Sequence, residues 1–395
     1  MADTREPRQC GGDAHAWELT VAESVGVGAR RTRVRILSPA PPVDSALREA
    51  IEAVGASIGT WGDRVSFEGD PRSLLRPAKL PAGFTSALER VLVRRERRSF
   101  SFPLSGGRAL RLGEPPAIFG VINATPDSFS DGGRFLAADA ARDRALEMIE
   151  EGVNVIDVGG ESTRPNAEPV SAAEETGRVV PVVLSIRATS TIPISIDTTK
   201  ASVAAAALDA GADIINDVSA LLEDSAMAPL ARDRGAPVIL MHRRGTPKDM
   251  QLDPRYDDVA REVYEFLAAR VRALRRQGLD PDRMIVDPGI GFGKTVEHNL
   301  TLLRDLDELR SLGLPVLVGA SRKSFMGRLL GELDVEERLA STLAAHAAAV
   351  LFGASAIRVH DVRQHRHLVT VLQAISLGAK PPPPAPVVSA EGGGR

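Results

Sequence analysis

The stretch that decides the fold is 115–160, PPAIFGVINATPDSFSDGGRFLAADAARDRALEMIEEGVNVIDVGG. It contains, in order, a short apolar run, a polar loop, a longer amphipathic segment and a second apolar run. Because the runs lack the strict alternation of a half-exposed strand, we expect strands that are buried on both faces, as in a parallel sheet. The stretch therefore predicts a strand–helix–strand unit.

The same unit repeats along most of the remaining chain. Eight repeats in about 260 residues match a (β/α)8 TIM barrel, an α/β fold. The rival, a doubly wound open sheet, would use about five or six strands and a Gly-rich first loop that the sequence lacks. The eight runs are Ile118–Ile122, Val155–Val158, Pro193–Ile196, Ile214–Ile215, Val238–Met241, Met284–Val286, Pro315–Val318 and Ala356–Val359.

Segments on either side of the predicted barrel (113–377) have a different composition. We expect residues 1–30 to be disordered and residues 31–112 to form a small N-terminal α+β extension to which we assign no role. The Pro- and Gly-rich tail 378–395 has little to bury, which predicts disorder. Within the extension we expect a strand at 33–38, a helix at 44–54, a hairpin at 57–68 and a solvated basic face at 94–98.

The overall composition excludes several classes of protein. The 395 residues carry 49 Lys and Arg against 52 Asp and Glu, a formal net charge of -3. Such a balance supplies no global field for nucleic acid or a membrane surface, so we expect neither partner. The single cysteine, Cys10, excludes a disulfide scaffold and a cysteine-based metal centre. No apolar run of about 18 residues and no secretory signal is present, which predicts a cytoplasmic protein.

A polar or ionisable residue follows each predicted strand. Any one Asp or Asn here could simply cap the next helix, but all eight carboxyl ends meet at one mouth of a barrel, where such enzymes place their chemistry. The residues or segments are Asn123, Gly159–Arg164, Asp197, Asn216–Asp217, His242, Asp287, Ser321–Ser324 and His360–Asp361.

Three loops refine this prediction. The segments 124–135 and 159–169 are longer than ordinary connections and rich in Gly, Pro, Ser and Asp, which favours active-site loops that close over a substrate. The segment 287–295, DPGIGFGKT, resembles a phosphate-binding P-loop but has Pro288 where the first glycine is needed, so we reject ATP binding. No histidine spacing indicates zinc, whereas Mg²⁺ is compatible with Asn123 and a substrate phosphate.

Seven segments together resemble the dihydropteroate synthase family over about residues 115–377. They are GVINATPDSFSDGG (120–133), VIDVGGESTRP (155–165), ISIDTT (194–199), INDVSA (215–220), DPGIGFGKT (287–295), GASRKSFMG (319–327) and RVHDV (358–362). The resemblance implies a (β/α)8 barrel that joins 6-hydroxymethyl-7,8-dihydropterin diphosphate to 4-aminobenzoate, releasing diphosphate, in tetrahydrofolate biosynthesis. It also implies Mg²⁺ and a homodimer.

The resemblance also implies roles for individual residues. Asn123 would bind the metal, and the pterin would be held by Asp197, Asn216, Asp287 and Lys323. Phosphate would be met by Thr163, Arg164, Arg358 and His360. Ser324, with the loop around Arg164, would position 4-aminobenzoate. Arg164, Lys323 and Asp197 would be the catalytic groups.

Chemistry and departures from the family pattern complete the prediction. One buried carboxylate can accept both the amino group and the adjacent ring N–H of a pterin. The aryl amine is already a nucleophile, so positioning and electrostatics should supply most of the rate.

Asn166 and Arg243–Arg244 depart from the family pattern and leave loop geometry open. Two rivals remain, a pterin-binding methyltransferase acting on a corrinoid and a catalytically silent pterin-binding paralogue.

Overall fold

The computed structural model describes residues 19–26, 29–36, 45–53, 57–61, 64–68, 72–75, 83–124, 134–162, 167–246 and 248–378. Thr163 and Arg164 of the predicted site, Asn166, the loop 125–133 and the tail from 379 lie outside these residues. Among the described helices, none combines the length and apolar character needed to span a membrane.

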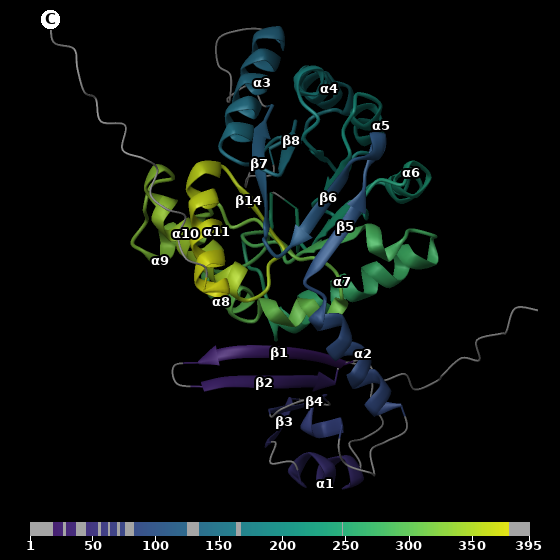
Figure 1. Ribbon diagram of the computed structural model, residues 1–395, viewed down its shortest axis with the longest axis vertical. Coiled ribbons are helices and arrows are strands. Elements are labelled where there is room, and N and C mark those ends of the chain that lie inside the picture. Colours follow the sequence, from purple (N-terminus) through teal and green to yellow (C-terminus); the bar gives the residue numbers. More distant parts are fainter. Residues whose placement is uncertain are drawn as a thin grey trace, which may run out of the picture.

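All eight predicted runs form parallel strands of one sheet (Figure 1). They are β7 (Ala117–Asn123), β8 (Val155–Gly159), β9 (Ile194–Asp197), β10 (Ile214–Asp217), β11 (Val238–Met241), β12 (Met284–Asp287), β13 (Leu317–Val318) and β14 (Ala356–Val359). The strand order is β12-β11-β10-β9-β8-β7-β14-β13, and a bridge between Val286 and Val316 joins the two ends. The predicted TIM barrel is therefore confirmed.

Helices surround this barrel and bury apolar faces against it (Figure 1). The α-helices are α3 (Arg134–Glu150), α4 (Ala172–Thr189), α5 (Ala201–Asp209), α6 (Met227–Arg234), α7 (Val259–Arg276), α8 (Val296–Arg304), α9 (Ser324–Leu329), α10 (Leu339–Leu351) and α11 (Val362–Leu377). Short 3-10 turns are η4 (Pro281–Arg283), η5 (Leu306–Leu312) and η6 (Glu336–Arg338). Because the strands are buried on both faces, they need this outer layer as well as the barrel interior.

A hairpin closes the amino end of the barrel. It consists of β5 (Ser99–Pro103), the turn η2 (Ser105–Gly107) and β6 (Ala109–Gly113), and its buried Phe102 and Leu112 pack on residues near the amino ends of the strands. We expected these residues to belong to the N-terminal extension, and this boundary is wrong. The alternating pattern of SFSFP shows a half-buried strand but does not show what covers it.

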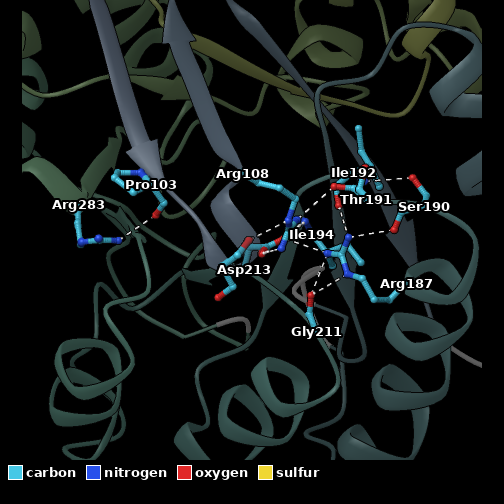
Figure 2. Close-up of polar contacts among 11 residues, drawn as sticks. Pro103, Arg108, Arg187, Ser190, Thr191, Ile192, Ile194, Gly211, Asp213 and Arg283 are labelled. Carbon is cyan, nitrogen blue, oxygen red and sulfur yellow. Dashed lines mark hydrogen bonds and ion pairs between the residues drawn. The ribbon is translucent and has the colours of Figure 1, made fainter.

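The hairpin is also fixed by charged contacts (Figure 2). Arg108 reaches the buried carboxylate of Asp213 at 2.5 Å, and Arg187 reaches the same carboxylate at 2.9 Å. Arg283 donates to the carbonyl of Pro103 at 3.1 Å. The barrel's base is therefore a closed, polar-rimmed layer, and the mouth is left at the opposite end.

The N-terminal unit is a four-stranded antiparallel sheet with two α-helices, in strand order β1-β2-β4-β3. Its elements are β1 (Leu19–Gly26), β2 (Ala29–Ile36), α1 (Ser45–Ala53), β3 (Ser57–Trp61), β4 (Arg64–Glu68), η1 (Ser73–Leu75) and α2 (Phe84–Glu96). The expectation of disorder through residue 30 is wrong for 19–26 and 29–30, which form a strand pair. Leu19 and Val21 supply the alternating apolar face of β1, which is buried in the unit's core.

This unit docks on η5 of the barrel. Thr20 donates to Glu308 at 2.6 Å, and the Val21 amide donates to Ser311 Oγ at 3.0 Å. Arg95, 6% exposed, donates to the carbonyl of Val21 and forms an ion pair with Asp307. The expected solvated face at 94–98 is therefore wrong at Arg95, because its partner lies more than 200 positions away.

Candidate active site

Five predicted residues meet around one cavity at the carboxyl end of the barrel. The cavity, with the open space at its mouth included, has a volume of about 410 Å³ and has Asp197, Asn216, Asp287, Lys323 and Arg358 in its wall. Each residue lies near the end of a different strand or just after it, so the barrel brings together side chains that are spread from Asp197 to Arg358 in the sequence. Its remaining lining residues are Val218, Met241, Gly289, Ile290, Phe292 and Gly319.

Arg358 forms the centre of the polar wall. Its Nε donates to Asp157 Oδ2 at 2.6 Å and its Nη2 donates to Asp197 Oδ2 at 2.7 Å. Asp157 also accepts from Asn216 Nδ2 at 3.3 Å. The two carboxylates raise the pKa of Arg358 against the opposing effect of burial, so the guanidinium stays charged.

Asp157 was missed by the sequence analysis. It is completely buried and holds both Arg358 and Asn216 in place. A signal was present, since Asp157 is the one charged residue inside the otherwise apolar run Val155–Val158. An unpaired charge there would be too costly to bury, so its presence indicates a buried partner.

The two carboxylates that face the cavity have raised pKa values. Burial raises the pKa of Asp287 to about 6, although the Gly289 amide, which donates to Oδ1 at 2.7 Å, acts in the other direction. Burial also raises the pKa of Asp197 to about 7, despite the attraction of Arg358. Both carboxylates are therefore poorly solvated and are suited to accept hydrogen bonds from a ligand.

The segment 287–295 forms one wall through tight backbone turns. Gly289 has φ +67°, and a Cβ there would lie 1.9 Å from the carbonyl oxygen of His242, so only glycine fits. Lys294 is 2% exposed and its Nζ lies 2.9 Å from the carbonyl oxygens of Gly289 and Phe292. Lys294 therefore stabilises its own loop instead of reaching toward the cavity as a P-loop lysine would.

Lys323 lines the same cavity as Asp287. Its Nζ sits 4.0 Å from the centroid of the Phe292 ring, a cation–π contact. A Cβ on Gly291 would approach Lys323 Cδ to 2.9 Å, so the glycine gives the lysine its path to the cavity. The ammonium and the Asp287 carboxylate thus share one cavity wall.

Salt bridges that the sequence analysis did not identify hold the base of the second long loop, 159–169. Lys200 Nζ lies 2.6 Å from Glu161 and 2.5 Å from the buried Glu175. Glu161 also accepts from the Val170 amide at 2.9 Å, so both ends of the loop are held. The described parts of 159–170 are therefore fixed next to the mouth.

Other predicted residues lie away from the cavity lining. Asn123 is exposed at the end of β7, and Ser324 is exposed at the start of α9. His360 is beside Ser321, whose Oγ lies 2.9 Å from His360 Nδ1. Asp217 accepts from the Ser219 and Leu221 amides and so shapes its own turn.

His242 has a packing role. The residue is buried, its Nδ1 lies 3.0 Å from Lys294 Nζ, and its ring packs edge-on against Phe266 at 4.9 Å. Burial lowers its pKa strongly, so the ring is neutral. Its strand-end position alone could not reveal this role.

Comparisons with known proteins agree with the geometry. The family model described as pterin binding enzyme matches residues 119–360. A dihydropteroate synthase of Synechocystis sp. is 46% identical over 277 residues, covering 70% of this chain and 96% of that relative. The dihydropteroate synthase of Escherichia coli strain K12 is 44% identical over 265 residues, covering 67% and 93%.

Solved structures give the same result. A Xanthomonas albilineans dihydropteroate synthase with 4-aminobenzoic acid has a TM-score of 0.65 and 43% identity, covering 71% of this chain and all of that one. The same enzyme in complex with 7,8-dihydropteroate has a TM-score of 0.63 at 40% identity, with the same coverage. The chain belongs to the family of pterin-binding enzymes. Its activity is that of the dihydropteroate synthases in this family, which are transferases of folate synthesis.

Proposed function

We propose that the cavity binds 6-hydroxymethyl-7,8-dihydropterin diphosphate and that 4-aminobenzoate approaches from the mouth, giving 7,8-dihydropteroate and diphosphate. The observation that carries this proposal is the meeting of Asp197, Asn216, Asp287, Lys323 and Arg358 around one cavity at the carboxyl end of the barrel.

The buried carboxylates would bind the ring. Asp287 accepts the pterin amino group and adjacent ring N–H as a pair, since one carboxylate can accept two parallel donors. Asn216, oriented by Asp157 at 3.3 Å, offers an amide to the ring edge. Lys323 donates to the ring oxygen or nitrogen. The apolar side chains of Met241, Ile290 and Phe292 cover the ring faces.

The diphosphate would lie toward the mouth. Arg358, His360, Thr163 and Arg164 meet its oxygens and stabilise the charge that develops as it leaves. His360 is a neutral donor in this arrangement, because burial lowers its pKa to about 4. Ser321 Oγ accepts from the His360 amide at 3.2 Å and lies 2.9 Å from Nδ1, which holds the ring in place. The tautomer protonated on Nε2 is the one that would donate to the diphosphate.

The reaction needs no covalent intermediate with the protein. The nitrogen of 4-aminobenzoate attacks the pterin methylene, a C–N bond forms, the C–O bond to diphosphate breaks, and the amine proton leaves with diphosphate or solvent. Lys323 and Asp197 stabilise charge on the pterin, and Ser324 with Arg164 positions the nucleophile. Orientation and preorganised charge supply the rate.

Mg²⁺ would be bound jointly by the protein and the substrate. Asn123 offers an amide oxygen at the rim, and oxygen ligands are those that Mg²⁺ prefers. No group of three or more His, Cys, Asp or Glu side chains that could hold a metal ion occurs in the described ranges. The diphosphate oxygens and water would therefore supply most ligands. When bound, the ion neutralises the departing anion.

A diphosphate-release assay tests the function. The protein should release diphosphate from the pterin substrate only when both 4-aminobenzoate and Mg²⁺ are present, and a chelator should stop release. Diphosphate release that does not depend on 4-aminobenzoate would refute the proposed reaction.

Arg164→Ala should lower kcat by about 100-fold while pterin affinity changes little, as expected for a group acting on the leaving anion. An unchanged kcat would remove Arg164 from the mechanism.

We also propose a homodimer in the cytoplasm. Leu351, Val371 and Ile375 on α10 and α11 expose large apolar side chains, which supports an association surface. Sedimentation of the purified full chain tests this proposal, and a monomer at micromolar concentration would refute it.

A further inference from the structure

The N-terminal unit reaches the barrel through a buried arginine. Arg35, on β2, has a side chain only 10% exposed, and its Nη1 lies 3.0 Å from Glu308 and 3.2 Å from Asp258. Glu308 belongs to the docking surface on η5. Asp258 differs, because it caps α7 by accepting from the Arg261 amide at 3.1 Å. One guanidinium thus joins the docked unit to the start of a barrel helix.

Asp258 ends the segment 242–258, which connects β11 to α7. Glu262 accepts from the Asp258 amide at 3.2 Å and forms an ion pair with Arg244 at 2.9 Å. The Arg244 guanidinium lies 4.1 Å from the centroid of the Tyr256 ring. The segment is therefore tied together by contacts that begin beside Asp258.

Two side chains of this segment hold the cavity wall. Tyr256 donates its hydroxyl to the carbonyl of Gly293 at 2.9 Å, and Gln251 donates to the carbonyl of Gly291 at 2.7 Å. Phe292 lies between these two glycines, lines the cavity and contacts Lys323. A continuous series of contacts therefore runs from Arg35 through Asp258 and Tyr256 to the wall of the proposed pterin site.

We propose that Arg35 is a positioning residue for pterin binding and that the N-terminal unit uses it to hold the cavity wall in its binding arrangement. This inference rests on the proposed function of the cavity. Without Arg35, the carboxylates of Asp258 and Glu308 would face each other without the cation between them. Their repulsion would displace the start of α7 and the Tyr256 contact to Gly293.

The test compares full-length variants by calorimetry with the pterin diphosphate and by steady-state kinetics. Arg35→Gln should raise the Kd and the KM for the pterin by about fivefold or more, while kcat and the KM for 4-aminobenzoate stay within about twofold. Asp258→Asn removes the ion pair to Arg35 without creating the repulsion, and an Asn oxygen can still cap α7, so this variant should raise the pterin Kd by a smaller factor than Arg35→Gln. Thr20→Val is the matched control, since it removes a docking bond to Glu308 without touching Asp258.

A double-mutant cycle separates coupling from docking. Tyr256→Phe removes the Gly293 bond, and combining it with Arg35→Gln should cost less than the sum of the two single effects. Additive effects, or a wild-type pterin Kd in folded Arg35→Gln, would overturn the inference. A wild-type protein that fails to bind the pterin diphosphate would instead refute the proposed function.

Discussion

Burial of Asp287 makes its protonation state sensitive to pH near neutrality. Burial raises its pKa to about 6 from a reference of 3.8. Only the ionised carboxylate can accept both donors of a pterin edge. The same shift makes the free energy of unfolding fall as the pH rises from 3.8 toward 6, because the unfolded chain ionises first.

Pterin affinity should therefore depend on pH through Asp287. Asp197 in the same cavity titrates with a pKa of about 7, so the Kd should be constant only above about pH 8, and below pH 6 it should rise at least about tenfold for each pH unit. Calorimetry with 6-hydroxymethylpterin, which lacks the diphosphate, avoids titration of the phosphates. Asp287→Asn is the control and should bind weakly at every pH. A wild-type Kd that stays flat down to pH 5 would contradict this assignment.

At the same scale, the sequence predicted the residues that end strands but missed their support. Asp197, Asn216 and Asp287 could be predicted to converge, because parallel strands of a barrel share one mouth. Arg358 was predicted only through the family resemblance. Asp157 stands out as a charge in an apolar run, but its partner could not be identified without knowing that Arg358 lies opposite. The neighbours of a buried charge depend on tertiary contacts that a single strand does not encode.

Among the elements, the loop stem near 159–170 depends on Lys200. This residue lies at the N-cap of α5 and forms ion pairs with both Glu161 and Glu175. Desolvation of Glu175 is offset only while the ammonium remains. The loop that carries Thr163 and Arg164 is thus anchored through Glu161 to Lys200 and Glu175, which lie outside it.

Lys200→Met should loosen this anchor. We expect the free energy of unfolding to drop by about 3 kcal/mol, because a buried carboxylate loses its partner, and kcat to fall with the loop's misplacement. Chemical denaturation and turnover measure the two effects. Lys248→Met is a matched control, since Lys248 lies in an exposed pair with Glu168. Unchanged stability and turnover in Lys200→Met would show that the clamp is dispensable.

Element boundaries were predicted less well where burial by residues distant in the sequence decides them. The eight barrel strands were predictable because two-sided burial leaves an apolar run. The hairpin 99–113 was assigned to the wrong unit, and Leu19–Gly26 was expected to be loose, because the surfaces that bury both are formed by distant residues.

For the whole molecule, the base and the mouth of the barrel have separate tasks. Phe102 closes the base with a fully buried ring, whereas the cavity lies at the other end. Phe102→Ala should lower the free energy of unfolding by about 3–5 kcal/mol, with KM values within about twofold of wild type. Thermal unfolding and kinetics check both. Val93→Ala, at an exposed position, should change neither, and a large KM change in Phe102→Ala would contradict this division.

The junction between β12 and β13 has a consequence for breathing of the barrel. A single bridge at Val286 joins these strands, with its amide donating to the Pro315 carbonyl at 3.0 Å. Asp287 ends β12 and Lys323 follows β13, so a pterin bound by both residues would link the two strands and stabilise their junction. The Val286 amide should exchange with deuterium sooner than amides of β8, and bound pterin should slow it selectively.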